Sequence, residues 1–395
     1  MNISQRGHKV PPSPIRKLVP FAEMAKDNGV VVHHLNIGQP DVHTPPQFFE
    51  ALSGFPDRTV AYGHSAGFAS LRKAMAGYYR RVGYDVETEH VTVTTGGSEA
   101  ILFAMMAICD PGDEIICFEP FYTNYNGYAV QAAVQLKPLR CNIEDGYHLP
   151  PRERIEALIT PRTRAIIVCS PNNPTGTVLR RDEMQTLVDI ARERDLFLIS
   201  DEAYREFVYG EVPHTGVLEF PEIADRAVLM DSLSKRYSLC GGRVGCLVTH
   251  NPDLRRTFLH LGQARLCPPS VEQHGSIPLL SLENDYFQQV QTEYKLRRDT
   301  VMRGLQQIPG VVSRTPEGAF YVMARIPVKD SGRFAQWLLT NFRLDNETVM
   351  VAPGDGFYAT AGLGLDEIRI AYVLEVPKLE RAMFCLKEAL AQYQD

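Results

Sequence analysis

Short apolar runs alternate with helical patterns between about residue 50 and residue 280 of the chain. The runs lack the polar alternation of a half-exposed strand, which is typical of strands that are buried on both faces. We predict strands at residues 91–95, 114–118, 165–169, 196–199, 227–230 and 246–249. Buried strands that are separated by helices indicate a mainly parallel sheet covered by helices on both sides.

Two of the intervening helices have distinct patterns. Residues 98–108 are apolar nearly all round, as in a helix that is buried on most sides. Residues 182–194 are amphipathic instead, and their apolar face consists of Met184, Leu187, Val188 and Ala191. Both patterns support a sheet that lies between two helical layers.

The pattern changes after about residue 282. Residues 282–307 predict one long charged helix, which suits a connection between two domains. Further elements are expected as strands at 319–323, 349–351 and 368–370 and as a last helix at 379–393. These elements indicate a second, smaller α/β unit.

The first part of the chain differs from both units. It is rich in proline and irregular, with one short helix expected at residues 21–26. We therefore predict an N-terminal arm at 1–45 that joins the small domain, a large domain at 46–284 and a small C-terminal domain at 285–395.

The composition is that of an ordinary globular chain. Its 395 residues exceed one hydrophobic core, so two domains are expected on length alone. A net charge of -6 gives no reason to expect nucleic acid or an anionic membrane as a partner. No apolar run approaches the ~20 residues that cross a bilayer, and residues 1–10 lack a signal-peptide core. We expect a cytoplasmic protein.

Cysteine and histidine do not indicate a metal centre. The eight cysteines show no Cys-x-x-Cys spacing, and Cys117 and Cys169 lie inside apolar runs, so free buried thiols are expected. His33 and His34 are adjacent, but neighbours on a strand point to opposite faces and no third ligand is evident. We expect no metal site.

Polar residues follow the predicted strands, and ligands of open α/β sheets bind beyond the carboxyl ends of strands. Gly96-Gly97-Ser98 opens a helix after the 91–95 strand, where free N–H groups favour an anion. Tyr122 follows the next strand, where an aromatic ring either stacks on a planar ligand or simply packs. Asn173 precedes a proline and projects its amide, as an ordinary Asn-Pro turn also does.

Charged residues follow the later strands. Burial of the Asp201 carboxylate at the end of a strand costs free energy unless a cation, such as a protonated pyridine nitrogen, lies beside it. Alternatively, Asp201 caps the N-terminus of a helix. Tyr204 could donate a hydrogen bond to a phenolate oxygen on the same ring. Arg369 lies between isoleucines on an apolar strand and is expected to need a buried carboxylate partner.

Residues 230–244 carry the most specific chemistry. They predict an irregular loop between two buried strands, with Lys235 flanked by Ser232 and Arg243. Lysine forms Schiff bases with carbonyl compounds, and a hydroxyl with a guanidinium suits a phosphate. The loop alone would be read as an exposed lysine beside an arginine. Together with the other strand ends it predicts a site for pyridoxal 5'-phosphate (PLP).

These motifs resemble those of the class I/II aminotransferases of fold type I, the aspartate aminotransferase superfamily. The similarity covers essentially the whole chain. It includes residues 36–41 (Asn-Ile-Gly-Gln-Pro-Asp), Tyr62-Gly63, Gly67, Leu71-Arg72, Gly96-Gly97, 111–113 (Pro-Gly-Asp), 173–176 (Asn-Pro-Thr-Gly), 201–204 (Asp-Glu-Ala-Tyr), Ser232, Lys235, Arg243 and Arg369. The resemblance implies an α/β fold with a mainly parallel seven-stranded sheet and PLP as cofactor.

The resemblance also implies a role for each site residue. Lys235 would bind the cofactor covalently and transfer protons, and Asp201 would pair with the pyridine nitrogen. Asn173 and Tyr204 would bind the ring oxygen, and Tyr122 would stack on the ring. The phosphate would be bound by Gly97, Ser98, Ser232, Arg243 and the partner subunit's Tyr62. The substrate α-carboxylate would be bound by Arg369, Gly38 and Asn173. A homodimer with shared active sites follows from the same resemblance.

The implied reaction is ping-pong transfer of an amino group from an L-amino acid to a 2-oxo acid, with 2-oxoglutarate as the expected acceptor. Bacterial aspartate-specific relatives are expected to have a lysine after the two glycines, where this chain has Ser98. Aspartate, alanine and aromatic amino acids therefore stay open as donors. Alternatives on the same scaffold are a C–S β-lyase, a cyclopropane-forming synthase and, more remotely, a PLP-binding regulatory module.

Overall fold

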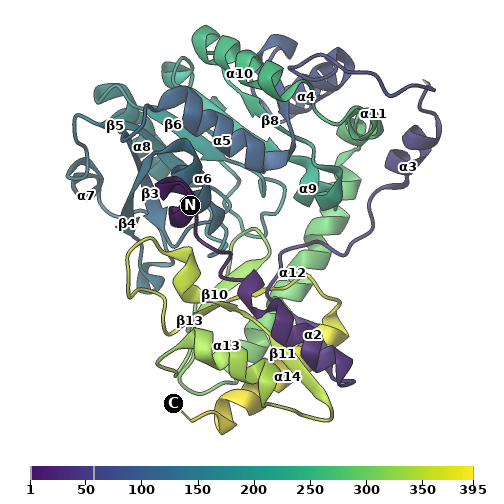
Figure 1. Ribbon diagram of the computed structural model, residues 1–395, viewed down its shortest axis with the longest axis vertical. Coiled ribbons are helices and arrows are strands. Elements are labelled where there is room, and N and C mark those ends of the chain that lie inside the picture. The colour runs from purple at the N-terminus through teal and green to yellow at the C-terminus, as the bar shows by residue number, and fades with distance from the viewer. Residues whose placement is uncertain (1, 57, 395) are drawn as a thin grey trace.

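The computed structural model describes residues 2–56 and 58–394. A seven-stranded sheet in the order β2-β8-β7-β6-β5-β3-β4 forms the upper part of the molecule in Figure 1. Its strands are β2 (Val91–Thr94), β3 (Glu114–Glu119), β4 (Gln135–Arg140), β5 (Thr163–Cys169), β6 (Phe197–Asp201), β7 (Ala227–Ser232) and β8 (Gly245–Val248). All neighbouring pairs are parallel except those of β8, which is antiparallel to β2 and β7. The predicted mainly parallel sheet is confirmed.

Helices cover both faces of this sheet. Ile166 and Leu198 pack toward the core that contains α4 (Ala69–Arg81) and α8 (Arg181–Glu193). The alternate residues of the same strands pack on the opposite face, where the helices are α5 (Gly96–Ile108), α6 (Asn124–Ala132) and α10 (Pro252–Arg265). Side chains of a strand alternate in direction, so burial on both faces explains the continuous apolar runs of the sequence.

The lower part of the molecule contains two smaller sheets and the last helices. One sheet has the order β12-β13-β10-β9, with β9 (Val312–Ser313), β10 (Tyr321–Arg325), β12 (Ala352–Pro353) and β13 (Glu367–Ala371). The other pairs β1 (Val31–His34) in parallel with β11 (Glu347–Met350). The long helix α12 (Asn284–Gln306) runs between the upper and lower parts, and α13 (Ser331–Thr340) and α14 (Val376–Gln392) pack below (Figure 1).

The N-terminal segment is more ordered than its proline content indicates. It contains α1 (Gln5–Lys9), α2 (Val19–Asp27) and strand β1, and α2 packs on α13. Strand β1 has the sequence Val-Val-His-His, which lacks apolar alternation. Its partner β11 lies more than 300 residues away, so no local pattern indicates the pairing. The edge strand β4 was likewise not predicted, since it is polar, partly exposed and contains Pro138.

The remaining α-helices are α3 (Pro46–Ser53), α7 (Arg152–Glu156), α9 (Leu233–Arg236) and α11 (Ser270–Ser276). None of the helices in the described residues is both long and apolar enough to cross a membrane. The domain boundaries at residues 45 and 284 stay predictions.

Candidate active site

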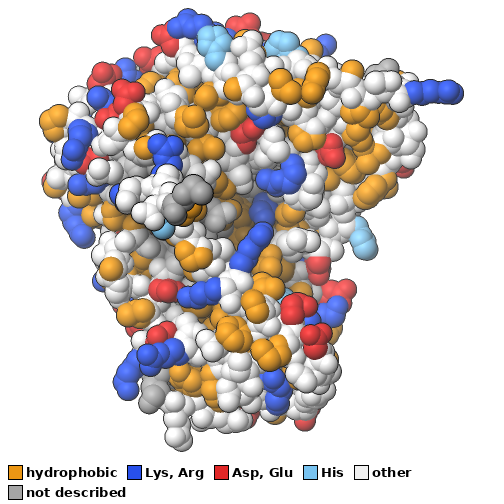
Figure 2. Space-filling view, viewed as in Figure 1, with side chains coloured by type: hydrophobic (Ala, Val, Ile, Leu, Met, Phe, Trp, Pro, Cys, Tyr) orange, Lys and Arg blue, Asp and Glu red, His pale blue; other side chains and the backbone are white. Residues whose placement is uncertain are grey.

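A cavity of about 580 Å³ lies at the carboxyl ends of the parallel strands, where the upper and lower parts of the molecule meet. Figure 2 shows this face hollowed there, with Lys and Arg side chains along the hollow. The cavity brings together the predicted residues Gly38, Gly97, Ser98, Tyr122, Asn173, Asp201, Tyr204, Ser232, Lys235, Arg243 and Arg369. Segments that are up to 330 residues apart in sequence thus form one site.

Lys235 lies on the short helix α9, so the expectation of an irregular loop was wrong. Ser232 ends strand β7 and caps this helix, because its Oγ accepts the Ser234 N–H at 3.2 Å. Lys235 Nζ donates to the Gly38 carbonyl at 2.7 Å. A Cβ on Gly38 would lie 1.8 Å from the Tyr321 hydroxyl, so only glycine fits beside the lysine.

An anion site is built next to the lysine. Helix α5 begins at Gly96, and its Gly97 and Ser98 line the cavity together with Ser232 and Arg243. The N-terminus of a helix and a guanidinium both favour negative charge. Gly96 has φ +73, and a Cβ there would lie 2.3 Å from the Arg243 guanidinium. Glycine therefore permits the close approach of α5 to Arg243.

Ser234 belongs to the same group, although sequence reasoning did not select it. Its hydroxyl accepts a hydrogen bond from Ser232 Oγ at 2.8 Å, and it also lines the cavity. The signal in the sequence was the second serine, directly before the lysine. Two hydroxyls that face a helix N-terminus and an arginine are well suited to hold a phosphate.

Asp201 ends strand β6 inside the cavity. Its carboxylate accepts hydrogen bonds from the Tyr125 hydroxyl at 2.8 Å and from the Ala203 N–H at 3.2 Å. No ion pair to it is formed by residues 2–56 or 58–394, and burial raises the pKa of Asp201 to about 6. A carboxylate in this position would be stabilised by a ligand that carries a positive charge. Tyr125, which orients Asp201, was not predicted.

Aromatic hydroxyls surround the same space. The Tyr204 and Tyr321 hydroxyls are 2.8 Å apart, and Asn124 Nδ2 donates to the Tyr122 hydroxyl at 2.7 Å. Burial raises the pKa of Tyr204 and of Tyr122, so both stay protonated at neutral pH. They are therefore available as hydrogen-bond donors or as flat packing surfaces for a ligand.

Arg369 lies on β13 and is only 3% exposed. It donates to Asn173 Oδ1 at 2.9 Å and to the Asn36 carbonyl at 2.6 Å, and burial lowers its pKa. Its Nε is buried and has no partner in the described part of the chain. The carboxylate that the sequence led us to expect is not supplied by residues 2–56 or 58–394, so it would come from a ligand.

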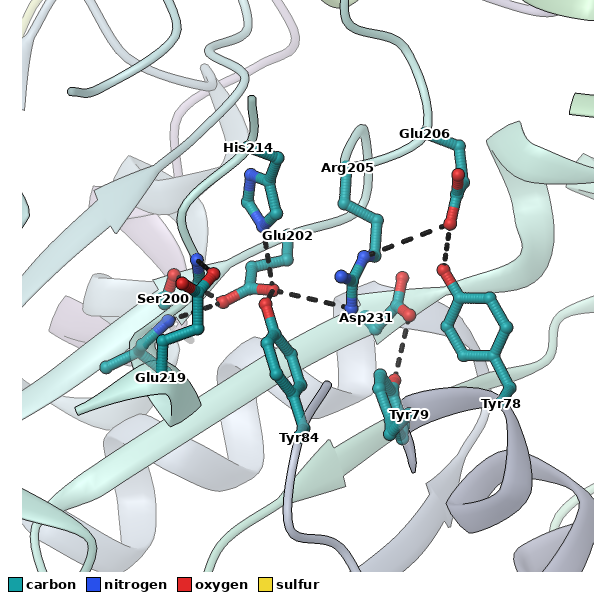
Figure 3. A network of polar contacts seen from close by, with 12 residues as sticks. Tyr78, Tyr79, Tyr84, Ser200, Glu202, Arg205, Glu206, His214, Glu219 and Asp231 are labelled. Atoms are coloured by element: carbon teal, nitrogen blue, oxygen red, sulfur yellow. Dashed lines mark hydrogen bonds and ion pairs between the residues drawn. The ribbon is translucent and has the colours of Figure 1, made fainter. Parts of the chain in front are cut away.

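Figure 3 shows a network of polar contacts that includes Asp231 and Glu202, the sequence neighbours of Ser232 and Asp201. Asp231 pairs with Arg236 at 2.6 Å and accepts from the Tyr79 hydroxyl at 2.8 Å. These two residues flank Ser232 and Lys235 in the sequence, so their ion pair fixes helix α9 to strand β7. Glu202, next to Asp201, is fully buried among the other members of the network.

One predicted site residue, Tyr62, and one group of possible metal ligands lie outside the cavity. Tyr62 is 81% exposed and does not line it; its assignment to the partner subunit's site stays a prediction. His33, Glu347 and Cys385 come close enough to hold a metal ion. However, the same Glu347 oxygen already accepts from Arg381 at 2.7 Å and contacts His33 at 2.9 Å, so a cation would have to displace an arginine.

The fold and this cavity are those of a cofactor-dependent α/β enzyme, and comparison with known proteins identifies its class. The family described as aminotransferase class I and II matches residues 31–383. The aspartate aminotransferase of Pyrococcus horikoshii is 32% identical over 98% of this chain and 97% of its own. The aromatic-amino-acid aminotransferase 2 of Thermococcus litoralis is 29% identical over 99% of both chains. The structure of alanine aminotransferase from Pyrococcus furiosus has a TM-score of 0.90 and 30% identity, covering 99% of this chain and 100% of its own.

The chain belongs to the class I and II aminotransferase family and is an aminotransferase. The predicted membership of this family is thereby confirmed, with relatives that match essentially the whole chain. Enzymes of this family use PLP.

Proposed function

We propose that this chain binds PLP through Lys235 and transfers an amino group from an L-amino acid to a 2-oxo acid by a ping-pong mechanism. The observation that carries the proposal is a set of unsatisfied groups around one lysine. Among the described residues, Asp201 has no cation and Arg369 has no carboxylate. Arg243 donates to two backbone carbonyls there and has no carboxylate partner. A pyridinium, a substrate carboxylate and a phosphate would supply these three missing partners.

When bound, PLP serves as an electron sink for the substrate Cα. The protein orients the reactants and moves the proton. Asp201 keeps the ring nitrogen charged, and Asn173 and Tyr204 donate to the ring oxygen. Arg369, Asn173 and the Gly38 backbone hold the α-carboxylate so that the Cα proton faces Lys235. The Lys235 amine would act as the base that takes up this proton.

The anion site would hold the phosphate of the cofactor. Gly97 and Ser98 offer N–H groups of α5, and Ser232, Ser234 and Arg243 offer side-chain donors. Five donors around one phosphate fix the cofactor at the end opposite the reacting carbon. Tyr122 is placed to cover a ring held in this way.

Aspartate, alanine and aromatic amino acids are the proposed donors, with 2-oxoglutarate as the proposed acceptor. The relatives named above carry these three kinds of substrate in their names. Ser98 is the residue of the site that differs from the lysine expected in aspartate-specific bacterial relatives. The identity of the donor therefore depends on other residues of the cavity.

A homodimer with shared sites is part of the proposal. Phe49, Val60, Tyr62 and Leu266 are large apolar side chains that are mostly exposed in the single chain. Burial of these side chains against a second copy would bring Tyr62 to the partner's phosphate site. Sedimentation should give a dimer, and Tyr62→Phe should weaken PLP binding; a monomer with full activity would contradict this part.

Single-turnover mixing of PLP-loaded protein with each of the twenty amino acids tests the reaction. We expect the absorption of the cofactor to convert from the pyridoxal to the pyridoxamine form with at least one amino acid, and 2-oxoglutarate to reverse the change. Absence of conversion with every amino acid would contradict the transaminase reaction. Formation of pyruvate and a thiol from cystathionine, without conversion, would favour the C–S β-lyase.

A further inference from the structure

The N-terminal arm crosses the mouth of the cavity. Helix α1 lies against α6 beside the seven-stranded sheet, and the purple start of the chain is seen there in Figure 1. Helix α2 packs on α13 and β1 in the lower part of the molecule. Between these two anchors, Ser13, Ile15 and Arg16 line the same cavity as Lys235. The arm thus contributes side chains to the site that the large sheet builds.

The backbone at Arg16 is held by its neighbours in the arm. Its N–H donates to Ser13 Oγ at 3.3 Å, and Leu18 anchors the segment in the lower core, where it is 2% exposed. The adjacent Lys17 has a different environment, because its Nζ lies 4.0 Å from Asp355 and it does not line the cavity. Arg16 is therefore the cation that this turn presents to the cavity.

The Arg16 guanidinium has no partner of its own. Its side chain is exposed, and within residues 2–56 and 58–394 it forms no hydrogen bond or ion pair. The proposed function assigns a role to each of the other cations that line the cavity. Lys235 binds the cofactor, Arg243 binds its phosphate and Arg369 binds the substrate α-carboxylate. Arg16 is the cation of the lining that the proposed function leaves unused.

Other polar residues of the lining do not supply a positive charge. Ser98, Tyr122 and Asn124 also line the cavity and are neutral. A second carboxylate on a substrate would therefore meet no cation at position 98. A guanidinium matches the two oxygens of a carboxylate with parallel N–H groups, which a neutral wall of hydroxyls and amides does not provide.

We propose that Arg16 reads the substrate side chain by pairing with a second carboxylate, so that dicarboxylic amino acids and 2-oxo acids are the preferred substrates. The inference rests on the proposed function and adds the residue that sets its specificity. Ile15 and Ile37 beside Arg16 would shield the ion pair from water.

The test compares Arg16→Gln, Arg16→Lys and the control Lys17→Gln in the full-length, PLP-loaded protein. Single-turnover kcat/KM is measured for aspartate and glutamate and for alanine and phenylalanine. We expect Arg16→Gln to lower the values for aspartate and glutamate by roughly 100-fold and to change those for alanine by less than about threefold. Arg16→Lys should lose less activity with aspartate and glutamate than Arg16→Gln, because lysine keeps the positive charge but lacks the two parallel N–H groups of a guanidinium. Lys17→Gln should behave as the wild type.

A binding measurement gives an independent readout. Succinate should raise the Tm of the wild type and of Lys17→Gln, whereas propionate should not, and Arg16→Gln should abolish the succinate shift. An unchanged aspartate kcat/KM in Arg16→Gln, or an equal loss for alanine, would overturn the inference and leave the transaminase reaction intact. Failure of every amino acid to convert the cofactor would instead overturn the proposed function, and succinate binding would still test Arg16.

Discussion

Asp201 and Glu202 are neighbours in sequence, yet they lie in regions of opposite character. Asp201 faces the cavity, without a cation in the described chain, and burial raises its pKa to about 6. Glu202 faces the network of Figure 3. Burial alone would raise its pKa as well, but His214, Arg205 and the Val217 N–H hold the pKa of Glu202 at about 2. One carboxylate is satisfied by the protein, and the other is not.

Two of the buried arginines, Arg236 and Arg369, repeat this difference. Arg236 belongs to the network and pairs with Asp231, whereas Arg369 in the cavity meets an amide and a carbonyl and keeps a buried Nε without a partner among the described residues. Burial of a charge is costly unless it is paired. The difference teaches that the charges of the network have partners within the protein. The proposed function assigns the unpaired charges of the cavity to a cofactor and a substrate.

Removal of the lysine should have the largest effect. Lys235→Ala takes away both the covalent link and the proton-transfer base, so we expect kcat to fall by roughly 10⁴-fold. Steady-state assays with the preferred amino acid measure the loss. Added methylamine should restore part of the activity, since it replaces the base; a variant that keeps more than a tenth of the wild-type kcat would contradict the role of Lys235.

Neutralisation of the cavity carboxylate should come next. Asp201→Asn keeps the shape but not the charge, so the ring nitrogen loses its proton and kcat should fall by roughly 10³-fold. PLP should still bind, because the phosphate donors are unchanged, and its absorption titration reports this. Near-wild-type turnover would show that Asp201 does not act on the cofactor.

Disruption of the network should affect stability more than chemistry. Arg236→Met leaves Asp231 buried and unpaired, so the free energy of unfolding should fall by about 3 kcal/mol or more, as urea denaturation measures it. The matched double variant Asp231→Leu/Arg236→Met removes both charges and should regain most of that loss. If the single and double variants were equally unstable, the ion pair would not be what holds α9.

The smallest effect is a difference in pH dependence between the two carboxylates. A raised folded-state pKa means that ionisation of Asp201 opposes folding, so the cofactor-free protein should lose stability as pH rises from about 4 to about 6. Asp201→Asn should lack this loss. The lowered pKa of Glu202 has the opposite sign, and its contribution should be complete above about pH 4.5 and lost as pH falls toward 2.

Unfolding curves of wild type, Asp201→Asn and Glu202→Gln across this pH range test both signs. Addition of PLP should reduce the loss of folding stability that ionisation of Asp201 causes. A stability of the cofactor-free protein that is constant between pH 4 and 6 would contradict the account of Asp201.

The sequence predicts the sheet and the deep part of the site because both depend on local patterns. Apolar runs mark the strands, and the residues that follow them, such as Asn173 and Asp201, must meet at one edge of a parallel sheet. Elements whose stability comes from distant partners escaped prediction, as β1 shows by pairing with β11. Tyr125 and Arg16 escaped for the same reason, since their positions in the site depend on how separate segments pack.

Reduction of the PLP-loaded, full-length protein with borohydride tests the central claim most directly. The hydride fixes the cofactor to the lysine that holds it, and mass spectrometry of the digested chain identifies that residue. We predict a pyridoxyl group on Lys235, and its loss when the preferred amino acid is added before the hydride. A label on a different lysine, or no label on a protein that has bound PLP, would contradict the assignment of this cavity.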